Sequence, residues 1–490
     1  MALIRRAGRS LSMLKRSSLF HGKQKKQRQQ PIVSPSLPNL TPHLPSSLIR
    51  LQINTTYSAI PRGISSCSFR SSYIPNRLLT SEAQPKLPDE GIDDTQFLDF
   101  PGVKNTAFTC DLKFVSEKSE EVPCYRVLSE LGEPVDGAKL PQMADALALR
   151  IYENMITLQV MDYLFYEAQR QGRFSFYMTC SGEEAAIVAS AAALSNEDVI
   201  FAQYREQGAL MWRGFDLQEF AHQCYSNSAD YGKGRQMPIH YGSKKHNFVT
   251  ISSPIATQLS HAVGAAYSLK MDRKDACAVT YFGDGATSEG DFHAAMNFAA
   301  VMEAPVLFIC RNNGWAISTP ITDQYRSDGV ATKSRAYGMR SICVDGNDAL
   351  AVYSAVKSAR SMAISESRPI LIEVLTYRVS HHSTSDDSTK YRSGEELSHW
   401  KVMRDPVVRF RRWLEGNGWW NRQKDTELQS HSRKKIIAAM MNAESMKKPP
   451  LSDLFTDVYD SIPTNLKEQE SYVREAVAKN PNLYPSDVPL

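Results

Sequence analysis

Two short polar motifs, one on each side of a predicted helix, carry the residues best suited to chemistry. Gly283-Asp284-Gly285 follows an apolar segment at 276–282, and Asn312-Asn313 follows a second one at 304–311. Short apolar segments of this kind are typical of buried strands in a parallel sheet. Because the carboxyl ends of neighbouring parallel strands meet at one edge, we expect Asp284 and Asn313 to lie close together.

A carboxylate and an amide oxygen at one sheet edge are suited to a hard cation. Mg²⁺ prefers oxygen ligands in octahedral geometry and commonly shares them with substrate phosphates. The glycines would let the backbone approach a diphosphate closely, and a helix capped by Ser288 would direct its N–H groups toward it. A glycine–aspartate–glycine turn alone says little, but its position between predicted strands predicts a metal-diphosphate site.

The surrounding sequence alternates between strand and helix patterns. Helices are expected at 143–171 and 348–366, and further strands at 340–346 and 369–378. Such alternation predicts an α/β fold, a doubly wound and mainly parallel sheet with right-handed crossovers. A polar loop and helical sequence follow, so we expect a helical C-terminal extension.

The first 81 residues differ in composition from the rest of the chain. They contain 13 Lys and Arg and no acid, whereas the remainder has 57 − 13 = 44 bases against 53 acids. An Arg- and Ser-rich, acid-free start predicts an organellar transit peptide. The alternative, a basic arm for nucleic acid, lacks the interleaved aromatic residues of single-strand binders. We therefore divide the chain into a leader (1–81), an extended segment (82–140), a cofactor-binding α/β domain (141–380) and a regulatory loop with a helical region (381–490).

Other functional classes find little support. No segment approaches the roughly 18 apolar residues of a membrane span, so membrane insertion is not expected. The eight cysteines show no C-x-x-C pair, which predicts free, mostly buried thiols in a reducing compartment.

These motifs resemble those of thiamine-diphosphate enzymes, whose shared motif begins with G-D-G and ends with N-N, as Gly283 to Asn313 does here. RNNGWAISTP at 311–320 and YRVSHHSTSDDSTKYRS at 377–393 are similar to the alpha subunits of branched-chain 2-oxo acid dehydrogenases. The resemblance extends from about residue 95 to the carboxyl end. It implies oxidative decarboxylation of branched-chain 2-oxo acids and transfer of the acyl group to a lipoyl arm.

The resemblance also implies roles for individual residues. Mg²⁺ would be bound by Asp284, Asn313 and the backbone carbonyl of Trp315, where many relatives carry Tyr. Thiamine diphosphate would contact Gln203, Tyr204, Arg205, Ser253, Ile255, Asp284, Gly285, Ala286, Arg311, Asn313 and His382. A K⁺ site would comprise Ser252, Pro254, Thr257 and Gln258. Structural alternatives remain for some of them: Ser253 as a helix cap, Trp315 as core packing, and Arg205 and Arg311 as ordinary ion pairs.

His382 is the expected catalytic side chain. A neutral imidazole can donate a hydrogen bond to the substrate, and its ordinary pKa lies near working pH. Ser383 and Ser393 resemble regulatory phosphorylation sites of the family. A phosphate at Ser383 would add about two negative charges beside His382 and repel the substrate carboxylate.

The resemblance implies that the chain does not act alone. The carboxylate that activates the aminopyrimidine would come from a beta subunit in an α₂β₂ assembly, because the chain holds one predicted α/β unit. A lipoyl-bearing acyltransferase core, a kinase and a phosphatase would be further partners in the mitochondrial matrix. Helices 143–171 and 183–195 are candidate contact surfaces. Two alternatives stay open: the alpha subunit of pyruvate dehydrogenase, and a noncatalytic, basic-armed scaffold or nucleic-acid binder.

Overall fold

The computed structural model describes residues 97–100, 103–107, 112 and 122–490. The predicted leader at 1–81 therefore lies outside the described residues. The chain divides into two compact units, with the division after Phe108. In the first unit, β1 (Phe97–Phe100) and β2 (Val103–Ala107) pair in antiparallel fashion.

Seven strands of the second unit form one sheet in the order β3-β10-β11-β7-β6-β4-β5, and every neighbouring pair is parallel. The strands are β3 (Cys124–Tyr125), β4 (Val199–Phe201), β5 (Phe248–Val249), β6 (Ala278–Gly283), β7 (Val306–Asn312), β10 (Arg340–Asp345) and β11 (Ile370–Leu375). The predicted parallel α/β sheet is thus confirmed. The central strand β7 is buried along its whole length, as expected for a sheet covered on both faces.

Alternating residues of the central strands enter two separate cores, because successive side chains of a strand point to opposite faces. Phe282 and Phe308 pack with α5 (Thr257–Met271) and α6 (Gly290–Met302) on one face. Tyr281 and Ile309 pack on the other face. The helices that contribute to that core include α2 (Glu184–Ala192), α3 (Gln207–Trp212) and α8 (Ala349–Glu366).

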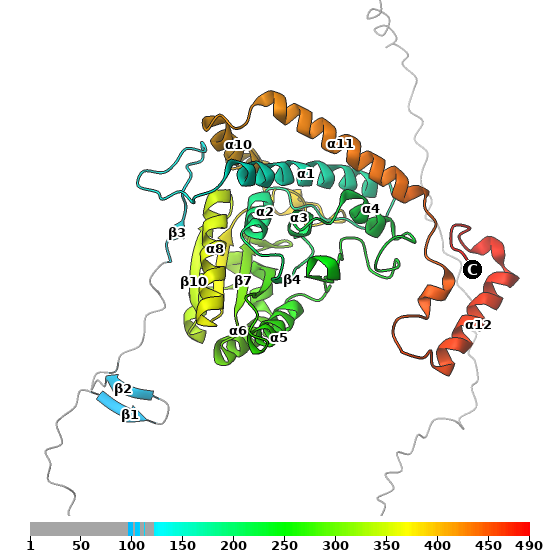
Figure 1. Ribbon diagram of the computed structural model, residues 1–490, viewed down its shortest axis with the longest axis horizontal. Helices are drawn as coiled ribbons and strands as arrows, with labels where there is room; N and C mark the ends of the chain where they lie inside the picture. The colour runs from blue at the N-terminus through cyan, green and yellow to red at the C-terminus, as the bar shows by residue number, and fades with distance from the viewer. Residues whose placement is uncertain (1–96, 101–102, 108–111, 113–121) are drawn as a thin grey trace, which may run out of the picture. The chain divides into compact units, whose positions relative to one another are not determined.

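An outer layer of helices covers this second core. The long helices α1 (Asp145–Arg170) and α11 (Arg422–Ser445) lie side by side over it, with α4 (Leu217–Tyr225) and α10 (Pro406–Gly416) next to them (Figure 1). The Tyr152 hydroxyl donates to Asp425 over 2.6 Å, and the Trp420 ring packs edge-on against Tyr152. Helix α1 confirms the helix expected at 143–171.

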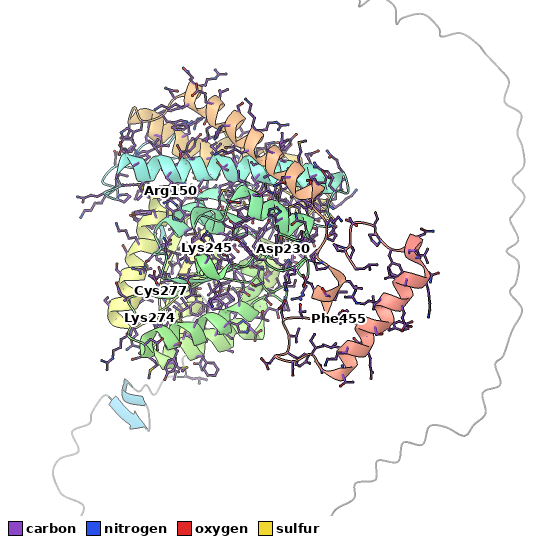
Figure 2. All side chains as sticks on the ribbon, turned by 45° about the vertical axis from the view of Figure 1, so that its right-hand side comes forward. Arg150, Asp230, Lys245, Lys274, Cys277 and Phe455 are labelled. Carbon is purple, nitrogen blue, oxygen red and sulfur yellow. The ribbon has the colours of Figure 1, made fainter. Side chains whose placement is uncertain are left out.

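The C-terminal segment returns to the body of the molecule. Phe455, which is buried, lies on the side of the body that carries Asp230 (Figure 2). Lys233 forms ion pairs with Asp453 and Asp457 over 3.4 Å and 2.6 Å. The shorter elements are α7 (Ile321–Gln324), α9 (Gly394–Met403), α12 (Thr464–Lys479), β8 (Trp315–Ala316) and β9 (Thr319–Pro320).

Three local predictions are wrong. Ser253 does not cap a helix, because the chain turns through Ala256 at φ 70° and α5 begins only at Thr257. Ser288 does not cap α6 either, since the 3₁₀-helix Asp284–Ser288 comes first and Glu289 occupies the N-cap position. Helix α2 is buried at Glu184 and the seven residues that follow it, so the helix expected at 183–195 packs inside this chain and is unsuited to subunit contact.

None of the helices in the described part of the chain combines the length and the apolar composition that crossing a membrane requires.

Candidate active site

The carboxyl ends of the central strands open into one cavity of about 280 Å³. Gly283 of β6 pairs with Arg311 of β7, so the residues that follow these positions meet at the same edge. The cavity is lined by many residues that the sequence predicts for the site: Gln203, Tyr204, Arg205, Ile255, Asp284, Gly285, Ala286, Arg311, Asn313, Trp315 and His382. Segments that lie up to 179 positions apart, from 203 to 382, thus form one site.

Asp284 presents its carboxylate at the end of β6. The side chain is 2% exposed, and one of its oxygens, Oδ2, accepts a hydrogen bond from Gln324 over 2.7 Å. Burial raises the pKa of Asp284, and the bond from Gln324 opposes that rise. A divalent cation beside Asp284 would favour the ionised form.

The orientation of the Asn313 amide is fixed by a buried carboxylate. Asn313 Nδ2 donates to Glu183 Oε1 over 2.9 Å, and its Oδ1 accepts from the Trp315 backbone N–H. Burial alone would raise the pKa of Glu183, but the charges of Arg311 and Arg205 outweigh it and lower the pKa. Because an ionised Glu183 can only accept, the amide oxygen of Asn313 is the atom turned away from it.

Arg311 is held between two acidic side chains. Its guanidinium contacts Glu183 over 2.7 Å and Glu206 over 3.0 Å, and all three side chains are almost completely buried. Arg311 therefore forms the ion pairs that were its structural alternative, while it also lines the cavity.

Arg205 and Arg378 are two buried arginines in the wall of the cavity. Each is 1% exposed, and neither forms an ion pair with a carboxylate among the described residues. Arg205 donates to the carbonyls of Thr179 and His382, and Arg378 to the carbonyl of Ile317. Burial, and then the charge of Arg205, lowers the pKa of Arg378 to about 10. Two buried cations facing one cavity form an environment suited to an anion.

His382 lies against these two arginines. Arg205 and Arg378 approach its Nδ1 over 3.1 Å and 3.3 Å. Since a guanidinium can only donate, Nδ1 must be the acceptor and Nε2 must carry the proton. Burial, followed by the charges of Arg205 and Arg378, lowers the pKa of His382 to about 3. The expectation of an ordinary pKa is therefore wrong in this environment, although the neutral imidazole is as expected.

Comparison with known proteins identifies the family to which this chain belongs. The model of the family described as "Dehydrogenase E1 component" matches residues 152–452, which include the whole cavity.

The chain belongs to the dehydrogenase E1 component family.

Curated relatives align with about four fifths of this chain. It is 61% identical to the 2-oxoisovalerate dehydrogenase subunit alpha 2, mitochondrial, of Arabidopsis thaliana over 85% of this chain and 89% of the relative. The mitochondrial subunit alpha of Caenorhabditis elegans is 49% identical over 78% and 89%. The human mitochondrial subunit alpha is 47% identical over 80% and 87%. The resemblance predicted from the motifs is thus confirmed.

The cavity has side chains that suit the diphosphate of the E1 cofactor, thiamine diphosphate, and a divalent ion bound to it. The unpaired charges of Arg205 and Arg378 suit a diphosphate, and the oxygens of Asp284 and Asn313 suit a divalent ion. A side chain at Gly285 would place its Cβ 2.8 Å from the Cβ of Ala316, so the backbone itself forms the wall there. No group of three His, Cys, Asp or Glu suited to a metal occurs in residues 122–490, so a metal here would depend on mixed ligands.

The residues of the predicted K⁺ site lie in the loop before α5 and in the first two residues of that helix. Thr257 Oγ1 contacts Ser252 Oγ and the Pro254 carbonyl, each over 3.1 Å, which groups three of the four predicted oxygen donors. Gln258 instead donates through Nε2 to the Tyr281 carbonyl. Ser253 Oγ lies 2.6 Å from His240 Nε2.

The two predicted phosphorylation sites differ in exposure. Ser383 follows His382, is 9% exposed, and accepts a hydrogen bond from the Ser385 N–H. Ser393 is exposed and caps α9 by accepting from the Glu396 N–H. Modification of Ser383 therefore requires the loop to open, whereas Ser393 is accessible in place.

Several residues of the site were missed by the sequence analysis. Arg378 lies within the motif at 377–393, but nothing in the sequence indicates that its charge is unpaired. Glu183 and Gln324, which orient Asn313 and Asp284, have no local signal. Glu289 lines the cavity and lies four residues after the glycine–aspartate–glycine segment, so its position alone could have suggested it.

Proposed function

We propose that this chain is the alpha subunit of a thiamine-diphosphate-dependent 2-oxo acid dehydrogenase that acts on 3-methyl-2-oxobutanoate and related branched-chain 2-oxo acids. The relatives described above carry the name 2-oxoisovalerate dehydrogenase subunit alpha. The observation that carries the proposal is the pair of buried, unpaired arginines beside the Asp284 and Asn313 oxygens. A diphosphate with a bound divalent cation would place an anion beside the two arginines and a cation beside the two oxygens.

Each part of the cavity has a proposed task. Arg205, with Gln203 and Tyr204 beside it, would hold the diphosphate. Asp284, Asn313 and the Trp315 carbonyl would bind Mg²⁺. When bound, thiamine diphosphate supplies a nucleophilic carbon for the 2-oxo group and an electron sink for the loss of CO₂.

His382 would act as a hydrogen-bond donor toward the substrate. Both arginines contact Nδ1. The Nε2–H has no hydrogen-bond partner among residues 122–490 and is therefore available to a substrate. A neutral N–H donor at the reacting centre stabilises developing negative charge without first having to gain a proton. The guanidinium groups of Arg205 and Arg378 hold the imidazole in this tautomer and attract an anionic substrate.

The grouped oxygens of Ser252, Pro254 and Thr257 support the K⁺ proposal. A K⁺ ion there would hold the loop that carries Ser253 and Ile255 at the cavity. Its binding would favour one conformation of the segment before α5, which contains Ala256 in the left-handed region.

We further propose that a beta subunit covers the outer faces of α5 and α6. These helices expose Tyr267, Met271, Phe298 and Val301, the last at 74%. Glu289, the N-cap of α6, lines the cavity, so the same helix extends from the cavity mouth to this apolar surface. Exposed apolar patches of this kind commonly mark subunit contacts, and "subunit alpha" in the names of the relatives agrees with a second chain.

The remaining proposals concern the complex. Residues 1–81 would direct the chain to the mitochondrial matrix, in line with the mitochondrial names of the relatives. A lipoyl-bearing acyltransferase core would accept the acyl group. A kinase and a phosphatase would act on Ser383 and Ser393.

Titration of the co-expressed alpha and beta chains with thiamine diphosphate and Mg²⁺ tests the proposal, with Asp284→Ala as the comparison. We expect saturable, Mg²⁺-dependent binding that the substitution removes. Unchanged binding in Asp284→Ala would contradict the metal assignment, and the alpha chain alone should not decarboxylate 2-oxo acids.

The substrate is decided by a separate measurement. The ratio of kcat/KM for 3-methyl-2-oxobutanoate to that for pyruvate should exceed one by a wide margin. A ratio below one would favour a pyruvate dehydrogenase alpha subunit. Binding of nucleic acid that depends on residues 1–81 and falls with salt, without cofactor binding, would favour the scaffold alternative.

A further inference from the structure

Cys124 and Cys343 lie directly opposite each other at the edge of the sheet. They are register partners in the parallel pair β3 and β10 (Figure 1). Neighbouring strands run about 4.8 Å apart, which falls within the Cα separation of about 4.4–6.8 Å that disulfides require. Register partners point to the same face of a sheet, and the two thiols form a hydrogen bond with each other.

The two thiols differ in their access to solvent. Cys124 is exposed on β3, a two-residue strand at the end of the sheet, whereas Cys343 is buried behind it. The other cysteines of the described residues, Cys180, Cys224, Cys277 and Cys310, are buried, and none is in register with another cysteine. A solute that attacks a thiol therefore reaches Cys124 first.

The contact between the two thiols makes Cys124 the more readily ionised of the pair. The hydrogen bond from Cys343 lowers the pKa of Cys124; burial and Asp345 oppose this shift, while Arg126 adds to it. The same hydrogen bond raises the pKa of Cys343. Since the thiolate is the attacking form, the exposed member of the pair is also the one that ionises first.

We propose that Cys124 and Cys343 form an oxidative modification site that hydroperoxides convert into an intramolecular disulfide. The Cys124 thiolate attacks the O–O bond of the hydroperoxide, forms a sulfenic acid and releases an alcohol, or water from hydrogen peroxide. The Cys343 sulfur then attacks the sulfenic sulfur, forms the S–S bond and releases water. The two thiols lose two electrons and two protons, and the hydroperoxide is reduced by the same amount.

The disulfide would lock the segment that enters the sheet. Residues after Cys124 are already held by Arg126, which pairs with Asp345 over 2.7 Å. The backbone N–H groups of Val127 and Leu128 donate to Asp348. A covalent bond at β3 would tie this segment to β10 at its first residue in the sheet, upstream of the contacts that now hold it.

Peptide mapping of the purified full-length chain after hydrogen peroxide treatment and alkylation tests the proposal. We expect a Cys124–Cys343 peptide pair whose mass lies about 2 Da below the sum of the reduced peptides, and which a dithiol separates. Protease cleavage between residues 124 and 343 should then leave the two fragments joined until a dithiol is added. Cys124 left as a thiol, or oxidised without Cys343 as its partner, would overturn the proposal.

Two variants assign the roles of the pair. Cys343→Ser should accumulate sulfenic acid at Cys124 that a dimedone probe labels, and Cys124→Ser should give neither label nor disulfide at this site. Cys277→Ser, at a buried cysteine directly before β6, serves as the control and should form the disulfide as the wild type does. Equal dimedone labelling of Cys124 in wild type and Cys343→Ser would contradict Cys343 as the resolving thiol.

Discussion

Arg205 donates a hydrogen bond to His382 Nδ1 over 3.1 Å and so fixes the imidazole proton on Nε2. Arg378 approaches the same nitrogen over 3.3 Å, which adds a second positive charge. The imidazole is thereby a neutral donor with one available N–H. The proposed role of His382 as a hydrogen-bond donor therefore depends on its contacts with the two arginines. It does not depend on a change of protonation near neutral pH.

His382→Ala should abolish the donor while the fold persists. Loss of a positioned donor or acid typically lowers the rate about 10²–10⁴-fold, and we expect kcat/KM for 3-methyl-2-oxobutanoate to fall within this range. Steady-state kinetics of the co-expressed pair measures it, with His399→Ala on the exposed side of α9 as the control. Activity within a few-fold of wild type would remove His382 from the reaction.

The lowered pKa of His382 also predicts how stability depends on pH. Between about pH 3, the pKa in the folded chain, and about pH 6.5, the unfolded chain binds a proton that the folded chain does not. Stability therefore falls as the pH decreases through this window, by about 2 kcal/mol from pH 6.5 to 5. The comparison of wild type with His382→Gln by urea unfolding, without cofactor, measures the difference. Parallel stability curves would contradict the assignment.

Arg378→Gln should weaken the binding of a simple anion. A ligand present at 100 times its dissociation constant stabilises the folded state by about 2.7 kcal/mol. We expect inorganic pyrophosphate with Mg²⁺ to raise the melting temperature of the wild type, and to do so far less in Arg378→Gln. The control is Arg340→Gln, which removes an exposed arginine paired with Glu366. An equal rise in all three proteins would show that the cavity does not bind the anion through Arg378.

The sequence predicts well which residues lie at the strand ends, but it predicts poorly which side chains contact them. Asp284 and Asn313 could be brought together from the alternation of strands and helices alone, because parallel topology fixes where strand ends meet. The lack of an ion pair at Arg378 could not be predicted from the sequence, since it depends on which side chains surround the guanidinium in the folded chain. Ser253 illustrates another limit: Ser-Pro is a common helix start, but the turn through Ala256 delays the helix and leaves Ser253 against His240.

Gly285→Ala should reduce cofactor binding through sterics. The added Cβ would lie 2.8 Å from the Cβ of Ala316, so the segment opposite must shift. Overpacking of this kind costs about 1–3 kcal/mol, which corresponds to an affinity loss of about five- to 150-fold if it falls on the bound state. Calorimetric titration with thiamine diphosphate and Mg²⁺ measures it. Gly416→Ala, where nothing lies within 4 Å of the added Cβ, should bind as the wild type does, and equal affinities in both variants would contradict the prediction.

A negative charge at Ser383 should have a different effect from one at Ser393. Ser383→Glu places a longer, charged side chain in a turn that is 9% exposed, and burying a charge without a matched partner is costly. The loop should therefore open, which would raise protease sensitivity between 380 and 392 and displace His382 from Arg205. Ser393→Glu adds its charge at the exposed start of α9, where the helix dipole is worth about 0.3–1 kcal/mol in its favour. Limited proteolysis together with kcat/KM compares the two variants, and equal losses of activity in both would show that exposure of the serine does not decide the effect.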